Sequence, residues 1–151
     1  MQQNKWAMSL KSFIQKPLIL FGILFCMAAS CEKNDHPFIP NRPVNFVIYP
    51  NEAAYLNLNY HGGYEYFTGG VSGIVVYRLD DWTFTAFDRA CPYDWDSPDS
   101  WIWVENGITL RCQECNSLFN ILDGGIISGP AKYPLKRYHT KYDGLKLRIY
   151  S

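Results

Sequence analysis

The sequence lacks three features that would each assign it to a familiar class of protein. Basic residues are not in excess, since 14 lysines and arginines are matched by 14 aspartates and glutamates, and a nucleic-acid partner is not expected. The apolar run from Leu18 to Ala29 is too short for a membrane span, which needs about 20 residues. No segment of useful length has helical spacing, so an all-helical fold is excluded.

The composition that is present describes one small globular domain. The chain has 151 residues, of which 48% are hydrophobic and 19% charged. Aromatic residues make up 17%, which is too many for a disordered protein. One hydrophobic core is therefore expected.

The first thirty residues have the pattern of an export signal. Three lysines precede the short apolar run, and small residues follow it up to Cys31. The sequence Ala28-Ala29-Ser30-Cys31 resembles the lipobox of bacterial lipoproteins, with Ala28 where a larger aliphatic residue is usual. This resemblance implies a signal peptide at 1–30, a lipid on Cys31 and a membrane anchor, in an exported protein of the periplasm or outer membrane. The alternative is ordinary cleavage after Ala29 or Ser30, which leaves Cys31 as a free thiol.

The exported part divides into a tether and a domain. Without residues 1–30, 11 basic residues remain against 14 acidic ones, which gives a formal charge of −3. Residues 31–43 are polar and contain three prolines, which is typical of a tether with little helix. The folded domain is expected at 44–151.

The domain has the pattern of strands and turns that is typical of an all-β protein. Short β-branched and aromatic runs alternate with glycine and asparagine turns, which predicts a small antiparallel barrel or sandwich. Glycines at 107 and 144 mark tight hairpins. The alternation of Leu56, Leu58 and Tyr60 with asparagines suits a half-buried strand. The expected strands are 44–49, 54–60, 73–79, 82–87, 101–104, 108–112, 117–121 and 145–150.

Three cysteines remain in the domain once Cys26 and Cys31 are set aside: Cys91, Cys112 and Cys115. They fall in two loops that a predicted hairpin connects. Loops joined in this way can converge, which is how a β-scaffold builds a metal site from residues distant in sequence.

These loops resemble those of the Rieske [2Fe-2S] family. Its first loop reads C-x-H and its second C-x-x-H-G-S-x-F, followed by a tight turn, a G-P-A-x-x-P-L loop and a terminal strand pair. The whole exported domain is similar to the Rieske-like lipoproteins of Bacteroidetes. The matching segments are Cys91 to Tyr93, Cys112 to Phe119, Asp123 to Gly125, Gly129 to Leu135 and Asp143 to Ile149.

The chain departs from this family at its ligands. Cys91 and Cys112 match the two cysteine positions, whereas Tyr93 and Cys115 occupy the two histidine positions. A standard centre, in which two histidines hold one iron, is excluded. The resemblance then implies an altered [2Fe-2S] cluster on Cys91, Cys112 and Cys115, with a fourth ligand from Tyr93, Asp94 or elsewhere. Such a domain would transfer electrons with a redox protein partner, and no residue set for catalysis of its own stands out.

Two other interpretations remain open for the same cysteines. Exported cysteines form disulfides, so the domain could be a metal-free structural or partner-binding module with one bridge among Cys91, Cys112 and Cys115. Zinc accepts three cysteines and one histidine, for which His139 is the downstream candidate.

Two further expectations concern residues near the loops. The tryptophans at 82, 95, 101 and 103 are expected mainly in the core, because aromatic residues of small β-domains usually pack there. The acidic residues Asp94, Asp96 and Asp99 are expected chiefly to keep an exposed loop soluble.

Overall fold

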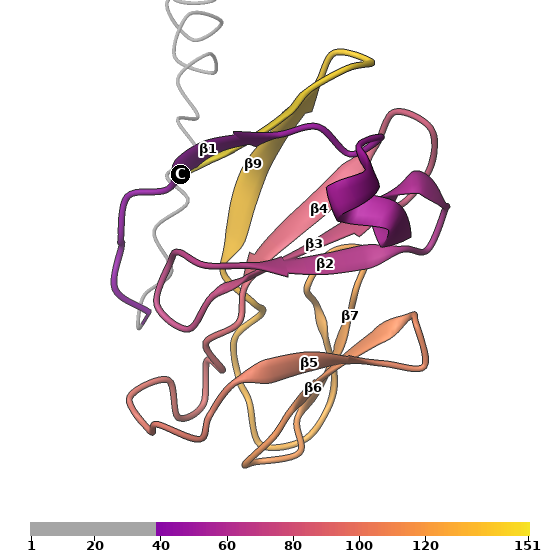
Figure 1. Cartoon of the computed structure of the whole chain (residues 1–151). Coiled ribbons are helices and arrows are strands. Elements are labelled where there is room, and N and C mark those ends of the chain that lie inside the picture. The colour runs from indigo at the N-terminus through magenta and orange to yellow at the C-terminus, as the bar shows by residue number, and fades with distance from the viewer. Residues whose placement is uncertain (1–38) are drawn as a thin grey trace, which may run out of the picture. The chain divides into compact units, whose positions relative to one another are not determined.

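A computed structural model describes residues 39–151, and the predicted signal peptide, Cys31 and the first part of the predicted tether lie outside this range. The described residues form strands and one short 3-10 helix (Figure 1). In chain order the elements are β1 (Asn45–Ile48), η2 (Ala53–Asn59), β2 (Tyr64–Phe67), β3 (Ile74–Arg78), β4 (Phe84–Asp88), β5 (Ile102–Glu105), β6 (Thr109–Cys112), β7 (Leu118–Asn120), β8 (Ile126–Ser128), β9 (Arg137–Tyr142) and β10 (Leu147–Tyr150).

The strands form two antiparallel sheets. The larger has six strands in the order β1-β10-β9-β4-β3-β2, and the smaller has four in the order β5-β6-β7-β8. The smaller sheet is inserted in the chain between β4 and β9, which are paired neighbours in the larger one. The sequence-based prediction of an all-β antiparallel domain with a separate two-loop unit is confirmed.

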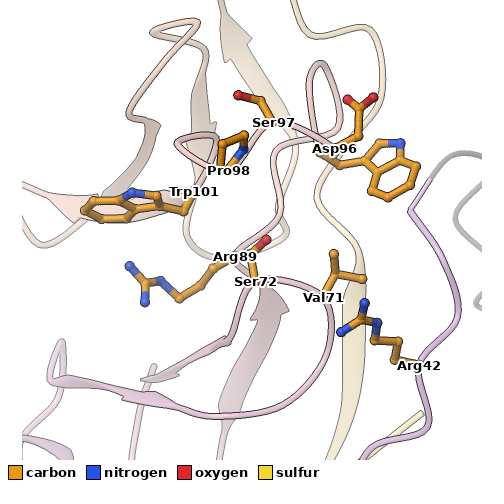
Figure 2. A pocket seen from close by; sticks show the side chains of 9 residues that line it. Arg42, Val71, Ser72, Arg89, Asp96, Ser97, Pro98 and Trp101 are labelled. Atoms are coloured by element: carbon orange, nitrogen blue, oxygen red, sulfur yellow. The ribbon is translucent and has the colours of Figure 1, made fainter.

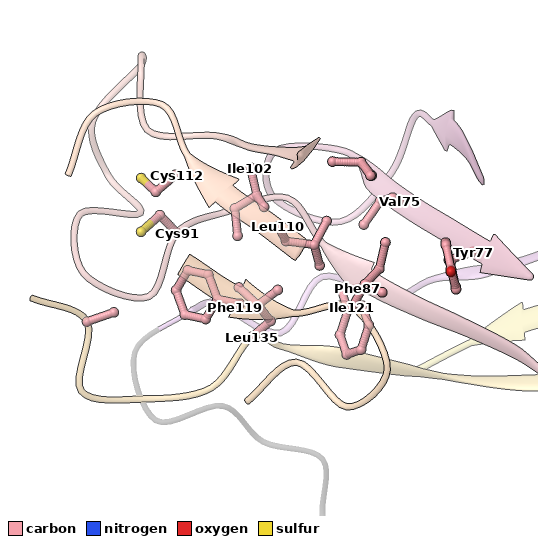
Figure 3. Packing of buried hydrophobic residues seen from close by; sticks show 12 residues of the cluster. Val75, Tyr77, Phe87, Cys91, Ile102, Leu110, Cys112, Phe119, Ile121 and Leu135 are labelled. Carbon is pink, nitrogen blue, oxygen red and sulfur yellow. The ribbon is translucent and has the colours of Figure 1, made fainter. Parts of the chain in front are cut away.

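The larger sheet is buried on both faces at its centre. All five residues of β3 are buried, and successive side chains of a strand point to opposite faces. Val75 therefore packs toward the smaller sheet, against residues such as Leu110 and Phe119, while Val76 packs on the other face with Leu147 and Ile149. The cysteines Cys91 and Cys112 belong to the first of these clusters (Figure 3).

The strand expected at 54–60 is wrong, because this segment is the 3-10 helix η2. Leu58 is fully buried, but Leu56 and Tyr60 are 61% and 72% exposed, so the alternation of leucines and asparagines does not define one buried face. The backbone of Gly63 approaches the Asn57 carbonyl so closely that no side chain would fit between them. Burial of a single leucine and this close approach favour a compact helical turn over an extended strand.

The segments that form β2 and β8 were not expected to be strands, and β9 was expected only as the first member of the terminal strand pair, without bounds. All three residues of β8 are exposed, and β9 carries charged residues at Arg137 and Lys141 along with polar Thr140. Strands with so few buried side chains lack the apolar alternation on which a sequence-based prediction depends. They pair through their backbones, β8 with β7 and β9 with β4 and β10.

The two predicted glycine hairpins are present. Asn106 and Gly107 have φ values of 54° and 74° between β5 and β6, and Gly144 has a φ of 92° between β9 and β10. Positive φ at both central residues is the geometry that tight antiparallel turns require. The β5–β6 hairpin matters for function because it connects the two cysteine loops.

The turn between β3 and β4 gives a test of acid stability. Asp80 Oδ1 accepts hydrogen bonds from the amides of Trp82 and Thr83, both at 2.8 Å. These bonds, with that from Trp82 as the largest cause, hold the pKa of Asp80 below its ordinary value. A lowered folded pKa stabilises the fold above the unfolded value, about 3.9, and this stabilisation is lost as the pH falls through the folded pKa.

We therefore expect Asp80→Ala to be less stable than the parent chain near neutral pH and to approach it in acid. Urea unfolding at a series of pH values, with NMR titration of the Asp80 carboxyl group, measures both effects. A stability difference that stays constant from neutral pH into acid would contradict the assignment.

The start of the described chain is attached to the domain. Ile39, within the predicted tether, is buried, and the Lys136 Nζ donates to the Pro40 carbonyl at 2.8 Å and to Asn41 Oδ1 at 3.2 Å. Residues before Val44, which were predicted to belong to the tether, therefore contact the folded domain. Between residues 39 and 151 the structure has no helix with the length and apolar character needed to cross a membrane.

Candidate metal centre

The two cysteine loops are held side by side by backbone pairing. Cys91 follows β4, and Cys112 is the last residue of β6, where it pairs with Ile102 of β5. A bridge between Ala90 and Trp101 closes the first loop at its base. The Gln113 amide then donates to the Trp101 carbonyl at 2.9 Å, which joins the second loop to the first.

This pairing brings three cysteines and one aspartate to a single point. The sulfur atoms of Cys91, Cys112 and Cys115 and a carboxylate oxygen of Asp94 all lie within 4.8 Å of one another. The Cys91 and Cys115 sulfurs are 3.5 Å apart, and the Cys112 sulfur is 3.7 Å from Asp94 Oδ1. Cys91 and Cys112 are buried, while Cys115 and Asp94 are partly exposed, so the site is open on one side. The expected convergence of Cys91, Cys112 and Cys115 is present in the structure.

The surroundings of Cys112 favour its deprotonated form, the thiolate. A hydrogen bond with Cys91 lowers the pKa of Cys112 to about 6, helped by the amides of Cys115 and Glu114. The same contact, together with burial, raises the pKa of Cys91, and burial raises that of Cys115. A metal ion binds cysteine as the thiolate and displaces its proton, and the lowered pKa of Cys112 favours this exchange.

Serine hydroxyls surround the four potential ligands. Ser100 is buried, and its hydroxyl hydrogen-bonds to Asp94 Oδ1 and lies 3.7 Å from the Cys112 sulfur. Ser117, also buried, has its hydroxyl 3.1 Å from the Cys115 sulfur. Groups of this kind orient metal ligands and tune their basicity.

The loop at Gly129 to Ala131 contacts Ser117, which lies beside the centre. The Ala131 amide donates to the Ser117 hydroxyl at 3.1 Å. Gly129 has a φ of 103°, and a Cβ there would lie 2.5 Å from the Ser117 Cα. This close approach explains why the loop needs glycine, and it connects the loop to Cys115 through Ser117.

A buried carboxylate fixes the base of the first loop. Asp88, at the end of β4, accepts hydrogen bonds from the amides of Val71, Ser72 and Ala90 at 2.8, 3.2 and 2.9 Å. The Tyr138 hydroxyl donates to it at 2.7 Å, and burial together with this bond raises the pKa of Tyr138. No sequence motif indicated this role for Asp88; its only signal was an acidic residue at the end of an apolar strand.

Asp94 is the residue whose role the sequence left most open. The sequence allows it to be a fourth ligand or one of three acidic residues that keep the loop soluble. The structure groups it with the cysteines, while Asp96 and Asp99 are exposed. Tyr93 points its ring toward solvent with 57% exposure, and it stays a predicted ligand. His139 lies on β9, where its ring stacks on Tyr150 of the neighbouring strand, so it is not the fourth member of the group.

The core position expected for the tryptophans is wrong. Trp82 is 70% exposed and Trp101 is 36% exposed, and Trp95 and Trp103 are partly buried. Trp101 instead stacks on the Arg89 guanidinium, whose carbon lies 4.9 Å from the ring centre, and the Tyr66 ring contacts the same group at 4.2 Å. Amphipathic rings of this kind cover charged groups at the rim of the core rather than filling its centre.

A surface pocket lies beside the first loop but does not include the cysteines. Arg89 and Trp101 line it, together with Val71, Ser72 and residues 96–98, as Figure 2 shows. The pocket is therefore a neighbour of the candidate metal centre and not part of it.

The donor set agrees with metal binding. Thiolates are the ligands that iron–sulfur centres and zinc share, and a carboxylate is acceptable to either metal. Three sulfurs and one oxygen that lie within 4.8 Å of one another give the four donors that such ions require. The residues present fit an iron or zinc centre.

Comparisons with known proteins found similarity to solved structures alone. No protein-family model matches the chain, and no curated protein matches it. Among solved structures, the ferredoxin of carbazole 1,9a-dioxygenase from Nocardioides aromaticivorans IC177 is similar at a TM-score of 0.49 and 16% identity, over 72% of this chain and 97% of that one.

Two other solved structures are similar to a comparable degree. The complex of reduced oxygenase and oxidized ferredoxin in carbazole 1,9a-dioxygenase gives a TM-score of 0.45 and 20% identity, over 60% of this chain and 82% of that one. A putative NADH-dependent nitrite reductase small subunit from Mycobacterium tuberculosis gives 0.45 and 14%, over 74% and 97%. The chain itself is an antiparallel β domain that gathers three cysteines and an aspartate at the ends of two loops.

Proposed function

We propose that this domain is a one-electron carrier whose redox centre is iron bound by Cys91, Cys112 and Cys115. The observation that carries the proposal is the convergence of three sulfurs and the Asp94 carboxylate within 4.8 Å. The loop pattern of the Rieske family favours a [2Fe-2S] cluster, whereas the close spacing of the donors favours a single ion. Both forms use the same thiolates and both supply one-electron chemistry when bound.

The ligands of this chain set the properties of the carrier. Thiolate in place of imidazole adds negative charge, so the reduction potential is expected to lie below that of a standard Rieske centre. Loss of both histidines also removes the titrating ligands, so the potential should depend little on pH. The partner is a redox protein that exchanges single electrons with the partly exposed side of the site.

We also propose that the carrier is exported and attached to a membrane of the cell envelope through a lipid on Cys31. The pattern of residues 1–31 supports this, as does its similarity to the Rieske-like lipoproteins of Bacteroidetes. Globomycin, which blocks lipoprotein signal cleavage, should make the unprocessed chain accumulate. Equal processing of Cys31→Ser and the parent chain would count against lipidation.

A second function is favoured by the 3.5 Å separation of the Cys91 and Cys115 sulfurs. In this case the two thiols lose two electrons and two protons to an oxidant of the exporting compartment and form a disulfide. The domain would then be a metal-free structural or partner-binding module. Its mass would be lower than that of the reduced chain by two hydrogens.

The experiment that tests electron transfer starts from the full-length chain purified without oxygen. We expect bound iron and a visible absorption that reductant bleaches and air restores. Cys112→Ser should lose most of the iron, because it removes one of the three sulfur ligands and the other two cannot hold the ion alone. Tyr93→Phe is the matched control in the same site, and it should keep its iron because the Tyr93 ring is exposed.

Two results would contradict the proposal, and a third would change its fourth ligand. A colourless chain with the mass of a disulfide would favour the second function. Equal iron in Cys112→Ser and the parent chain would place the metal elsewhere. Loss of iron from Tyr93→Phe would show that the tyrosine is a ligand and that Asp94 is not the fourth donor.

A further inference from the structure

The four donor atoms are closer together than a two-iron cluster requires. In a [2Fe-2S] cluster each iron takes two of the four protein ligands, and both irons and their bridging sulfides stand between the two ligand pairs. The donors of Cys91, Asp94, Cys112 and Cys115 are all within 4.8 Å of one another. However these four residues are divided into pairs, no wide separation between the pairs remains.

Two of the six donor separations match a single tetrahedral ion, and all six are within 4.8 Å. A metal–sulfur bond of about 2.3 Å gives a regular tetrahedron whose sulfur atoms are about 3.8 Å apart. A metal–oxygen bond of about 2.0 Å shortens the sulfur–oxygen edge to about 3.5 Å. The Cys91–Cys115 sulfur pair at 3.5 Å and the Cys112–Asp94 pair at 3.7 Å agree with these edges to within a few tenths of an ångström.

We infer that the centre binds one metal ion in a tetrahedral shell of three cysteines and one aspartate, with Asp94 as the fourth ligand. The inference rests on the proposed function only for the identity of the ion as iron. Asp94 is supplied by the first loop, three residues after Cys91, so each loop contributes two ligands.

The surrounding hydrogen bonds support Asp94 as a ligand. The Ser100 hydroxyl binds Asp94 Oδ1 and is close to the Cys112 sulfur, so it connects the donor from the first loop with one from the second. Ser100 is 1% exposed, and its position is fixed by the chain turning into β5. An aspartate that only keeps a loop soluble would not need a hydrogen bond from a buried side chain. A metal ligand is typically oriented by such a bond.

The redox step of such a centre is simple. With iron bound, Cys91, Cys112, Cys115 and Asp94 would hold the ion in both its ferrous and its ferric state, so one electron would pass to the redox protein partner without loss of a ligand. Three thiolates and one carboxylate carry four negative charges, so the net charge of the site changes from −2 to −1 on oxidation. The negative shell favours the ferric state, which agrees with a low potential.

The test is the stoichiometry of iron and sulfide in the full-length chain. Metal-free chain is given ferrous iron alone, without a sulfide source and without oxygen. We expect one iron and no labile sulfide per chain, and an EPR signal of isolated high-spin ferric iron after oxidation. Cobalt(II) in place of iron should give the intense visible bands of a tetrahedral thiolate site.

The possible failures are distinguishable. Two irons and two sulfides in the chain purified from cells would overturn the single-ion shell and leave electron transfer standing. One zinc per chain, with no uptake of iron, would support the shell and overturn electron transfer. No binding of iron, zinc or cobalt would overturn both.

Variants of the first loop test the fourth ligand. Asp94→Asn should weaken cobalt binding by at least about tenfold, since even partners outside the ligand shell have effects of that size. Asp94→Cys should bind cobalt with bands shifted toward those of four thiolates. Asp96→Asn, an exposed acidic residue of the same loop, should bind like the parent chain. Equal affinity for Asp94→Asn and Asp96→Asn would overturn the assignment.

Discussion

Replacing Asp88 by alanine should lower the free energy of unfolding by about 4 kcal/mol, one of the largest effects of any single change in the domain. The Asp88 carboxylate accepts three backbone amides and the Tyr138 hydroxyl, and it has no exposed surface. Alanine would leave the Ala90 amide and the Tyr138 hydroxyl buried without an acceptor, and the Val71 and Ser72 amides partly buried without one. Urea unfolding of the metal-free chain, followed by circular dichroism, measures the change.

Tyr138→Phe is the control for this prediction. It removes one of the four hydrogen bonds and keeps the ring, so it should cost only about 1 kcal/mol. Both variants keep every candidate metal ligand. The explanation would be wrong if Asp88→Ala and Tyr138→Phe had similar stabilities, because the amides of the first loop would then not depend on the carboxylate.

Replacing Gly129 by alanine should weaken metal binding by about ten- to a hundredfold and destabilise the domain by about 2 kcal/mol. The added Cβ would lie 2.5 Å from the Ser117 Cα, so either the loop or Ser117 must move. Ser117 contacts the Cys115 sulfur, so its displacement reaches a metal ligand. Cobalt titration measures the affinity, and urea unfolding measures the stability.

Gly107→Ala separates the two causes. Gly107 also has a positive φ, of 74°, but a Cβ there would meet no atom within 4 Å. It should therefore share the backbone strain of Gly129→Ala and keep normal cobalt affinity. If both alanine variants lost affinity equally, the effect would come from general destabilisation rather than from the contact with Ser117.

The sequence was sufficient to predict an antiparallel β domain and the meeting of the cysteines. Hairpin glycines at 107 and 144 have strong local requirements, and a hairpin between two loops can bring Cys91 and Cys112 together. It could not choose between Tyr93 and Asp94, because residues 92–100 form a loop in which side-chain direction follows no period.

Other features depend on contacts between residues that are far apart in the sequence. The alternating residues around Leu58 are typical of a strand. The packing of Leu58 in the core cluster of the larger sheet favours the helical turn η2 instead. Asp88 and Tyr138 are 50 residues apart, so their hydrogen bond has no local pattern. Trp101 stacks on the Arg89 guanidinium instead of packing in the core. Composition alone does not reveal this contact.

The positions of Cys91 and Cys112 have a consequence for folding. Cys91 follows β4 of the larger sheet, and Cys112 is the last residue of β6 in the smaller sheet. Both cysteines lie in the core between the sheets. An ion held by the two cysteines is thus a cross-link between the halves of the domain. Its removal should first loosen the attachment of the smaller sheet, visible as faster amide exchange in β5, β6 and β7 while β3 and β10 stay protected. Uptake of the ion would then complete assembly of the domain, in addition to supplying its redox centre.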